Sequence, residues 1–169
     1  MKRIGPKTYV ELRSFLAGED PTRQLAELRK GAAPALVQTL DSSAVAGREH
    51  LLLTLKQSVE LKGSSQLLAD RVEVDFLLRV AGTRQISKAV RVAGSQPGNK
   101  SILVVWGSAE DARSGLAEIR RLVELKPFKA DAPGKRAASR VNRVEMESVV
   151  GGGDVVSRLL AEKAALLRR

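Results

Sequence analysis

The stretch of sequence that decides the fold is Arg79-Val-Ala-Gly-Thr-Arg-Gln-Ile-Ser-Lys-Ala-Val-Arg-Val-Ala-Gly94. It continues a run from Val72 to Val80 that alternates at first and then becomes continuously apolar, as in a strand whose far end is buried on both faces. Gly82 is expected to allow a tight turn out of this strand, and Gly94 to end the next helix in a left-handed conformation. Residues 72–94 therefore predict a strand followed by a short helix that is fixed at both ends.

The predicted short helix has one apolar and one basic face. Apolar side chains recur at the i, i+3, i+4, i+7 spacing of a face that is buried along one side: Ile86, Ala89, Val90 and Ala93. Thr83 is placed to cap the first amides. Donors suited to phosphates or base edges gather on the opposite face, on the first turn and at the end of the strand: Arg84, Lys88, Arg91, Gln85 and Arg79. These donors are candidate RNA contacts, and a solvated helix face is the alternative.

Length and charge restrict the class of protein. The chain has 169 residues, of which 43% are hydrophobic, so we expect one core and one domain over residues 1–169. The formal net charge of +10 attracts polyanions and makes nucleic acid the leading partner class. An acidic protein or an anionic membrane surface would satisfy the same charge. Aromatic residues make up only 3%, so charge and backbone donors would supply most of the affinity for RNA.

The residues that the chain lacks argue against several kinds of site. It has no cysteine, which excludes disulfides and thiolate ligands, and its one histidine, His50, cannot form a zinc-binding cluster. An oxygen-only metal site is left open. No run approaches the roughly 20 apolar residues that cross a bilayer, and the N-terminus has no signal-peptide core. We therefore expect a soluble, cytoplasmic protein that does not enter membranes.

Two carboxylates suggest catalysis only weakly. Glu73 and Asp75 would lie on one face of the predicted strand, which is a geometry that acid-base chemistry can use. No nucleophile, metal motif or cofactor loop accompanies them. The sequence therefore predicts no enzyme, no cofactor and no small-molecule substrate.

The rest of the chain alternates irregularly between strands and helices. Further strands are expected at residues 7–15, 35–40 and 101–106. Further helices are expected at 21–29, 45–61, 108–123, 141–146 and from Asp154 to the C-terminus, with a loop at about 127–137 and a hinge at 151–153. This order is typical of an α+β fold, in which helices flank a mostly antiparallel or mixed sheet. A doubly wound fold is the alternative, because residues 72–106 could form a strand-helix-strand unit.

Two of these helices carry further candidate residues. His50 lies on the otherwise apolar helix at 45–61, and we expect a structural or RNA-binding histidine rather than a catalytic base. The C-terminal helix carries a wide apolar stripe: Val155, Val156, Leu159, Leu160, Ala164 and Leu167. This stripe suits docking on the protein's own core, binding to a partner, or both.

Three segments together resemble a known family. Residues 76–94, Phe76-Leu-Leu-Arg-Val-Ala-Gly-Thr-Arg-Gln-Ile-Ser-Lys-Ala-Val-Arg-Val-Ala-Gly94, resemble the Arg-x-Ser-Gly-x-Arg-Gln-Ile-x-x-Ala-Ile-x-x-x-Gly signature of the smallest KEOPS accessory subunit. This is the Cgi-type protein of archaea and fungi, called TPRKB in animals. The helix that begins His50-Leu-Leu-Leu and the segment Gly153-Asp-Val-Val-Ser-Arg-Leu-Leu resemble the family in the same order. Ala81 stands where the signature has serine, and Asp75 where glutamate is expected.

The resemblance implies a non-catalytic subunit of the complex that attaches threonylcarbamoyl to the adenosine beside the tRNA anticodon. In that family the small subunit binds and stimulates the PRPK-like kinase/ATPase subunit and helps to recruit tRNA by its 3′ CCA end. The basic helix face and His50 would then meet tRNA, and the apolar C-terminal helix would dock on the kinase. The alternative is a protein-only adapter that regulates a kinase without contacting RNA.

Overall fold

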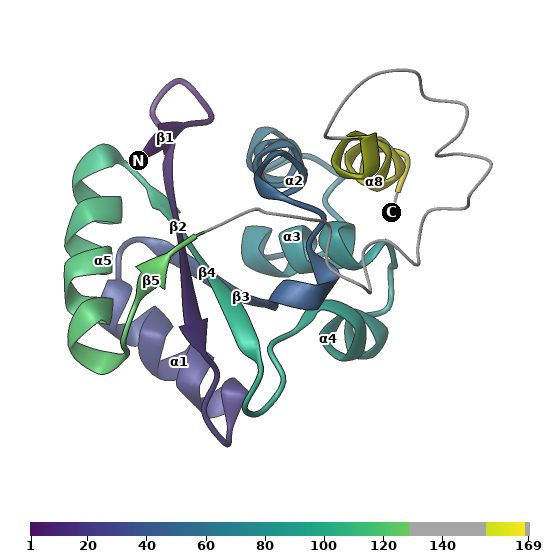
Figure 1. Cartoon of the computed structure of the whole chain (residues 1–169). Helices are drawn as coiled ribbons and strands as arrows, with labels where there is room; N and C mark the ends of the chain where they lie inside the picture. Colours follow the sequence, from purple (N-terminus) through teal and green to yellow (C-terminus); the bar gives the residue numbers. More distant parts are fainter. Residues whose placement is uncertain (129–154, 168–169) are drawn as a thin grey trace. The chain divides into compact units, whose positions relative to one another are not determined.

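The computed structural model describes residues 1–128 and 155–167, which divide into two compact units. Unit 1 takes the described residues of Met1–Ser42 and Ser95–Lys129, and unit 2 those of Ser43–Gly94 and Ala130–Arg169. Figure 1 shows that each unit joins segments that are far apart in the sequence. The single domain over residues 1–169 stays a prediction.

Unit 1 contains an antiparallel sheet. Its strands are β1 (Lys2–Arg3), β2 (Tyr9–Leu16), β3 (Leu36–Asp41), β4 (Lys100–Gly107) and β5 (Lys126–Pro127). The order is β1-β2-β4-β3, and β5 also pairs with β2. The register places Phe15 opposite Ser101 and Val37 opposite Val105. The predictions of an α+β fold and of a mostly antiparallel sheet are confirmed.

Helices α1 (Pro21–Ala32) and α5 (Ala109–Leu122) pack on one face of this sheet (Figure 1). Asp20 accepts a hydrogen bond from the Arg23 amide and Ser108 from the Asp111 amide, so each helix begins at a side-chain cap. Buried residues of both helices and the sheet form one cluster: Phe15, Leu28, Ala32, Ala35, Val37, Leu103, Val105, Leu116 and Ile119. These side chains hold the sheet and its two helices together.

Unit 2 is helical over its described residues. A 3-10 turn, η1 (Ser42–Ala44), precedes the helices α2 (Arg48–Glu60), α3 (Val72–Ala81), α4 (Ile86–Ala93) and α8 (Val155–Ala165). Helix α3 packs against α2, α4 and α8, and α8 also packs against α2. Helix α3 is therefore the central element of unit 2.

The predicted strand at 72–80 is wrong, because these residues form α3. A helix that is buried on nearly all sides shows the same continuous apolar run as a buried strand, and periodicity alone does not distinguish them. Nearly every residue of α3 is buried, including Glu73 and Asp75. No strand-helix-strand unit exists at 72–106, which removes the basis for the doubly wound alternative.

Two glycines confine α3 and α4, although not as predicted. Gly82 has φ +65° and ends α3, and its amide and that of Thr83 donate to the carbonyls of Arg79 and Leu78. Gly94 was expected to be left-handed, but its φ is −67°. A Cβ there would lie 2.6 Å from the Val90 carbonyl oxygen, so this position needs glycine for space rather than for backbone conformation.

Some predictions fall outside the described residues. These are most of the loop at 127–137, the helix at 141–146, the hinge at 151–153 and the cap at Asp154. In residues 1–128 and 155–167, none of the helices has both the length and the apolar character needed to span a membrane. The cytoplasmic location stays a prediction.

Candidate functional site

Helix α4 and the segment just before it present a set of exposed cations. The buried residues of the helix are Ala89 and Ala93, so the short alanine side chains bring this side of the helix close to α3. Arg84, Lys88 and Arg91 are exposed. Within the part of the chain that the structure describes, these three side chains have no ion-pair partner. Their donors are therefore available to a bound anion.

The apolar face predicted for α4 is only half buried. Ile86 and Val90 were expected to hold the helix down, but 55% of Ile86 and 46% of Val90 are exposed. The buried row runs through Ala89 and Ala93, and Ile86 and Val90 lie at the edge of this row, where their larger side chains are about half exposed. The surface of α4 thus combines two apolar side chains with Arg84, Lys88 and Arg91; we call these five residues the α4 face.

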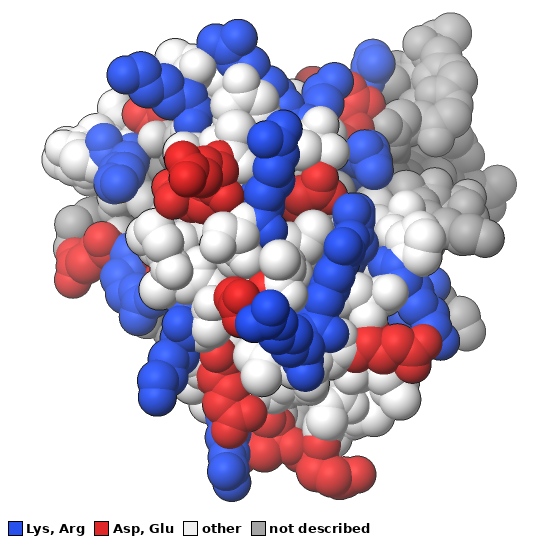
Figure 2. Space-filling model, turned by 90° about the vertical axis from the view of Figure 1, so that its left-hand side faces the viewer, with Lys and Arg blue, Asp and Glu red and all other residues white. Residues whose placement is uncertain are grey.

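The cations of the α4 face come from a stretch of sequence without acidic residues, whereas on α1 and α5 basic and acidic residues alternate. No Asp or Glu occurs in the sequence between Asp75 and Glu110. Figure 2 views the side of the molecule on which α1 and α5 lie, and there acidic residues are interspersed among the basic ones. Two of these cations are paired within their own helices: Arg23 with Glu27 at 3.2 Å and Arg121 with Glu118 at 3.0 Å.

Arg79 is not part of the α4 face. Its guanidinium is buried and its Nε donates to Asp75 Oδ2 at 2.8 Å, where both side chains are at most 1% exposed. Its other nitrogens donate to the carbonyls of Ala164 at 2.9 Å and Gln66 at 3.2 Å. Asp75 Oδ1 in turn accepts from the Leu68 amide at 2.7 Å. The predicted RNA contact at Arg79 is therefore replaced by an internal network that ties α3 to α8 and to residues 66–68.

The residues predicted for partner binding on α8 divide between the two sides of this helix. Leu160 and Ala164 are buried in unit 2, whereas Leu159 and Leu167 are half-buried. The side chains of Val155 and Val156 lie outside the described residues. Two further contacts hold the helix in place: Ser157 Oγ donates to the Ala46 carbonyl at 3.0 Å, and Gln57 Nε2 to the Ala161 carbonyl at 3.1 Å.

The outward side of α8 continues past its last turn. Leu166 follows the helix directly, and 76% of its side chain is exposed. Leu159 packs against the buried Ala46 and Leu160, so Leu166 is the leucine of this segment that leaves most apolar area available to a partner.

Comparison of the chain with known protein families and with known proteins points to one family. The model of the family described as kinase binding protein CGI-121 matches residues 20–145, which is more than half of the chain. The chain belongs to this family. A regulatory protein Cgi121 from Methanocaldococcus jannaschii is 28% identical over 132 residues, covering 77% of this chain and 81% of that protein. The predicted membership of the Cgi-type family is confirmed.

In this CGI-121 family member, His50 is also an internal residue. Its side chain is fully buried on α2, and its Nδ1 accepts a hydrogen bond from the Ala46 amide at 3.3 Å. This contact satisfies a backbone donor just before α2 begins. Of the two alternatives, the structural histidine fits this position, and His50 is not presented to RNA.

The network of Arg79 had a signal in the sequence that points to a helix. Asp75 and Arg79 are four residues apart, the spacing at which opposite charges pair on a helix but not on a strand. Glu73 and Asp75 also stand in the first turn of α3, where acidic residues are favoured. The exposure of Ile86 and Val90 had no comparable signal, because only the packing of α4 decides which way its apolar residues face.

Proposed function

We propose that this chain is a non-catalytic accessory subunit of a KEOPS-type complex in tRNA threonylcarbamoyladenosine modification. It binds and stimulates the PRPK-like kinase/ATPase subunit and recruits tRNA through the 3′ CCA end. Membership of a family described as kinase-binding, and a relative named as a regulatory protein, support the kinase half of this proposal. The α4 face supports the tRNA half, and it is the observation that carries it.

The α4 face suits RNA for a physical reason. Arg84, Lys88 and Arg91 offer charge to phosphates without an acidic neighbour in the sequence from 76 to 109. Gln85 is exposed at the start of α4 and adds an amide that can read a base edge or a ribose. The tRNA contacts are therefore assigned to Arg84, Gln85, Lys88 and Arg91, while Arg79 and His50 are internal residues of unit 2.

Gel-shift titration with tRNA tests this assignment. The double variant Arg84→Glu/Lys88→Glu is expected to weaken binding by about tenfold or more, because it removes two phosphate contacts and adds repulsion. The matched control is Arg113→Glu/Arg120→Glu, which makes the same charge change at two exposed positions on α5. A tRNA that lacks CCA should bind the unaltered protein as weakly as full tRNA binds the double variant. Equal affinity of both variants for tRNA would contradict the assignment.

The kinase surface is assigned to the outward side of α8. Leu166→Glu is expected to weaken binding to the PRPK-like subunit by about tenfold or more in calorimetry, and to reduce stimulation of its ATPase activity. Leu122→Glu is the matched control, because Leu122 is 53% exposed on α5 in unit 1. Leu160→Glu is a poor test, because this leucine is buried and its loss would disturb α8 itself. Unchanged kinase binding by Leu166→Glu would contradict this docking surface.

A protein-only adapter is the second candidate, and one observation favours it. Ile86 and Val90 expose apolar area among the cations of the α4 face, as a surface for an acidic protein would. The two functions differ in the gel-shift experiment. An adapter would bind the kinase subunit and lose that binding in Arg84→Glu/Lys88→Glu, but it would not shift tRNA.

A further inference from the structure

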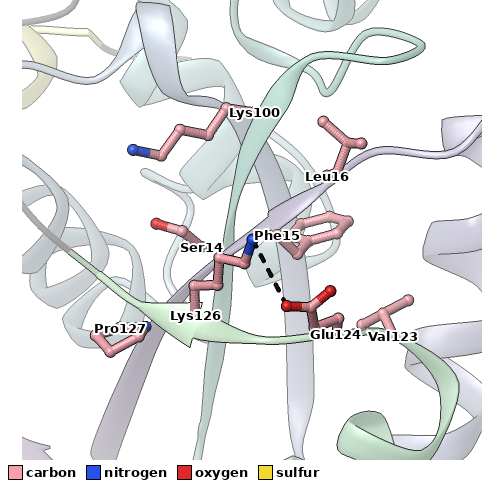
Figure 3. A pocket seen from close by; sticks show the side chains of 8 residues that line it. All are labelled: Ser14, Phe15, Leu16, Lys100, Val123, Glu124, Lys126 and Pro127. Carbon is pink, nitrogen blue, oxygen red and sulfur yellow. Dashed lines mark ion pairs between the residues drawn. The ribbon is translucent and has the colours of Figure 1, made fainter.

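Unit 1 contains a groove that the proposed function does not use. It has a volume of about 820 Å³ and is lined by the end of β2, the start of β4 and the segment around β5: Ser14, Phe15, Leu16, Lys100, Val123, Glu124, Lys126 and Pro127. Figure 3 shows these side chains arranged around it. Sites for small molecules typically enclose about 300 to 1,000 Å³, so a compact organic molecule matches the space.

The apolar part of the groove is held by the core of unit 1. Phe15 belongs to the buried cluster beneath α1 and α5, and Val123 packs against that cluster. Leu16 is the next residue on β2, and 68% of its side chain is exposed. A rigid apolar floor beside an exposed leucine is a preformed surface for an apolar body of a ligand.

The charges around the groove indicate the class of ligand. Lys126 pairs with Glu124 at 3.6 Å, as the dashed line in Figure 3 shows. Lys100 has no ion-pair partner within the described part of the chain. The lining therefore carries one uncompensated positive charge, which complements a single negative charge. It has no arginine, whose planar fork favours phosphate groups.

The polar part of the lining is carried by Lys100 rather than by Ser14. Ser14 precedes Phe15 on β2 and points to the opposite face of the strand, and its Oγ is buried. One uncompensated lysine and an apolar floor together describe a site for an amphipathic acid.

We propose that this groove binds a small organic monoanion, a carboxylate attached to an apolar body. The carboxylate lies beside Lys100, and the apolar body covers Leu16, Phe15 and Val123. The site is in unit 1, whereas the α4 face and α8 are in unit 2. The proposal stands independently of the tRNA and kinase assignments, and each can fail without the other.

Titration of the full chain with octanoate, followed by ¹H–¹⁵N NMR, tests the proposal. Saturable shifts are expected for the amides of residues 14–16, 100 and 123–126. Octanol has the same body without the charge, and it should bind about two- to fivefold more weakly, as expected for one exposed ion pair. Acetate has the charge without the body and should not saturate. Absence of saturable octanoate shifts at these amides, or equal binding of octanol, would overturn the proposal.

Two variants locate the two parts of the ligand. Lys100→Gln should lower octanoate affinity about two- to fivefold and leave octanol unchanged, whereas Lys30→Gln, at an exposed position on α1, should change neither. Leu16→Ser should weaken both ligands by about tenfold, since it removes most of the exposed apolar lining. Octyl phosphate should bind no more tightly than octanoate. Tighter binding of the dianion, or indifference of octanoate to Lys100→Gln, would contradict a monoanion site at this lysine.

Discussion

Helices α3 and α4 are neighbours in the sequence, but their charged side chains differ in burial and in pairing. On α3, Asp75 and Arg79 are buried and bound to each other, and the remaining donors of Arg79 reach two backbone carbonyls. On α4 and just before it, Arg84, Lys88 and Arg91 are exposed and have no ion-pair partner among the described residues. Arg79, before Gly82, therefore has a structural role, whereas Arg84 and Arg91, after it, are available to bind a ligand.

The difference teaches that net charge locates a binding surface only after paired charges are removed. The formal charge of +10 includes Arg79, whose charge Asp75 compensates internally, and cations of α1 and α5 that are paired within their helices. The cations of the α4 face have no such compensation in the described structure. This contrast, rather than basicity as such, singles out α4.

The largest expected effect is on stability, at Arg79. Arg79→Met leaves the Asp75 carboxylate buried without its partner, so the free energy of unfolding should fall by about 3 to 5 kcal/mol in urea titration. Arg84→Met, at an exposed position, should change it by no more than about 0.5 kcal/mol. Near-equal effects of these two variants would remove the distinction between α3 and α4.

A smaller effect tests the orientation of α4. Ala89 is fully buried, so Ala89→Leu should overpack the contact with α3 and cost about 1 to 3 kcal/mol of unfolding free energy. Ser87→Leu adds the same side chain at an exposed position of α4 and serves as the control. If Ser87→Leu proved the more destabilising, α4 would face the other way.

The cations of α4 should appear in the salt dependence of tRNA binding. If Lys88 contacts a phosphate, Lys88→Gln should reduce the slope of log affinity against log salt by about 0.7 to 0.9. Gel shifts at four or more salt concentrations measure this slope, and Lys30→Gln on α1 should leave it unchanged. An unaltered slope in Lys88→Gln would exclude this lysine from the phosphate contacts.

The smallest effect is expected at Ile86. Because this side chain is more than half exposed, Ile86→Gln should change the free energy of unfolding by about 0.5 kcal/mol or less. If Ile86 were buried, as the helical pattern predicts, its loss would instead lower the free energy of unfolding by about 2 to 5 kcal/mol. Thermal or urea unfolding distinguishes these outcomes clearly.

Local chemistry made much of the fold predictable. The apolar run at 101–106 forms the core of β4, and Ser108 with Glu110 and Asp111 starts α5, as capping and the helix dipole require. The strand predicted at 72–80 failed because α3 is buried on nearly every side, which erases the amphipathic period. At 72–80 the apolar pattern gave the wrong prediction, whereas the four-residue spacing of Asp75 and Arg79 indicated a helix.

The candidate site was predictable in its residue types but not in its exposure. The sequence places Arg84, Lys88 and Arg91 at helical spacing, and the structure exposes all three. Whether Arg79 points outward depends on its contact with α8, which is far away in the sequence. Whether Ile86 or Ala89 faces the core depends on how α4 packs on α3. Side-chain direction on a short helix is a tertiary property.

Photo-crosslinking of the full chain to tRNA, with the crosslinked residues located by mass spectrometry, tests the central claim most directly. The account predicts that crosslinks concentrate in residues 84–91 and depend on the CCA end. Crosslinks confined to α1 and α5, with none in residues 84–91, would contradict it.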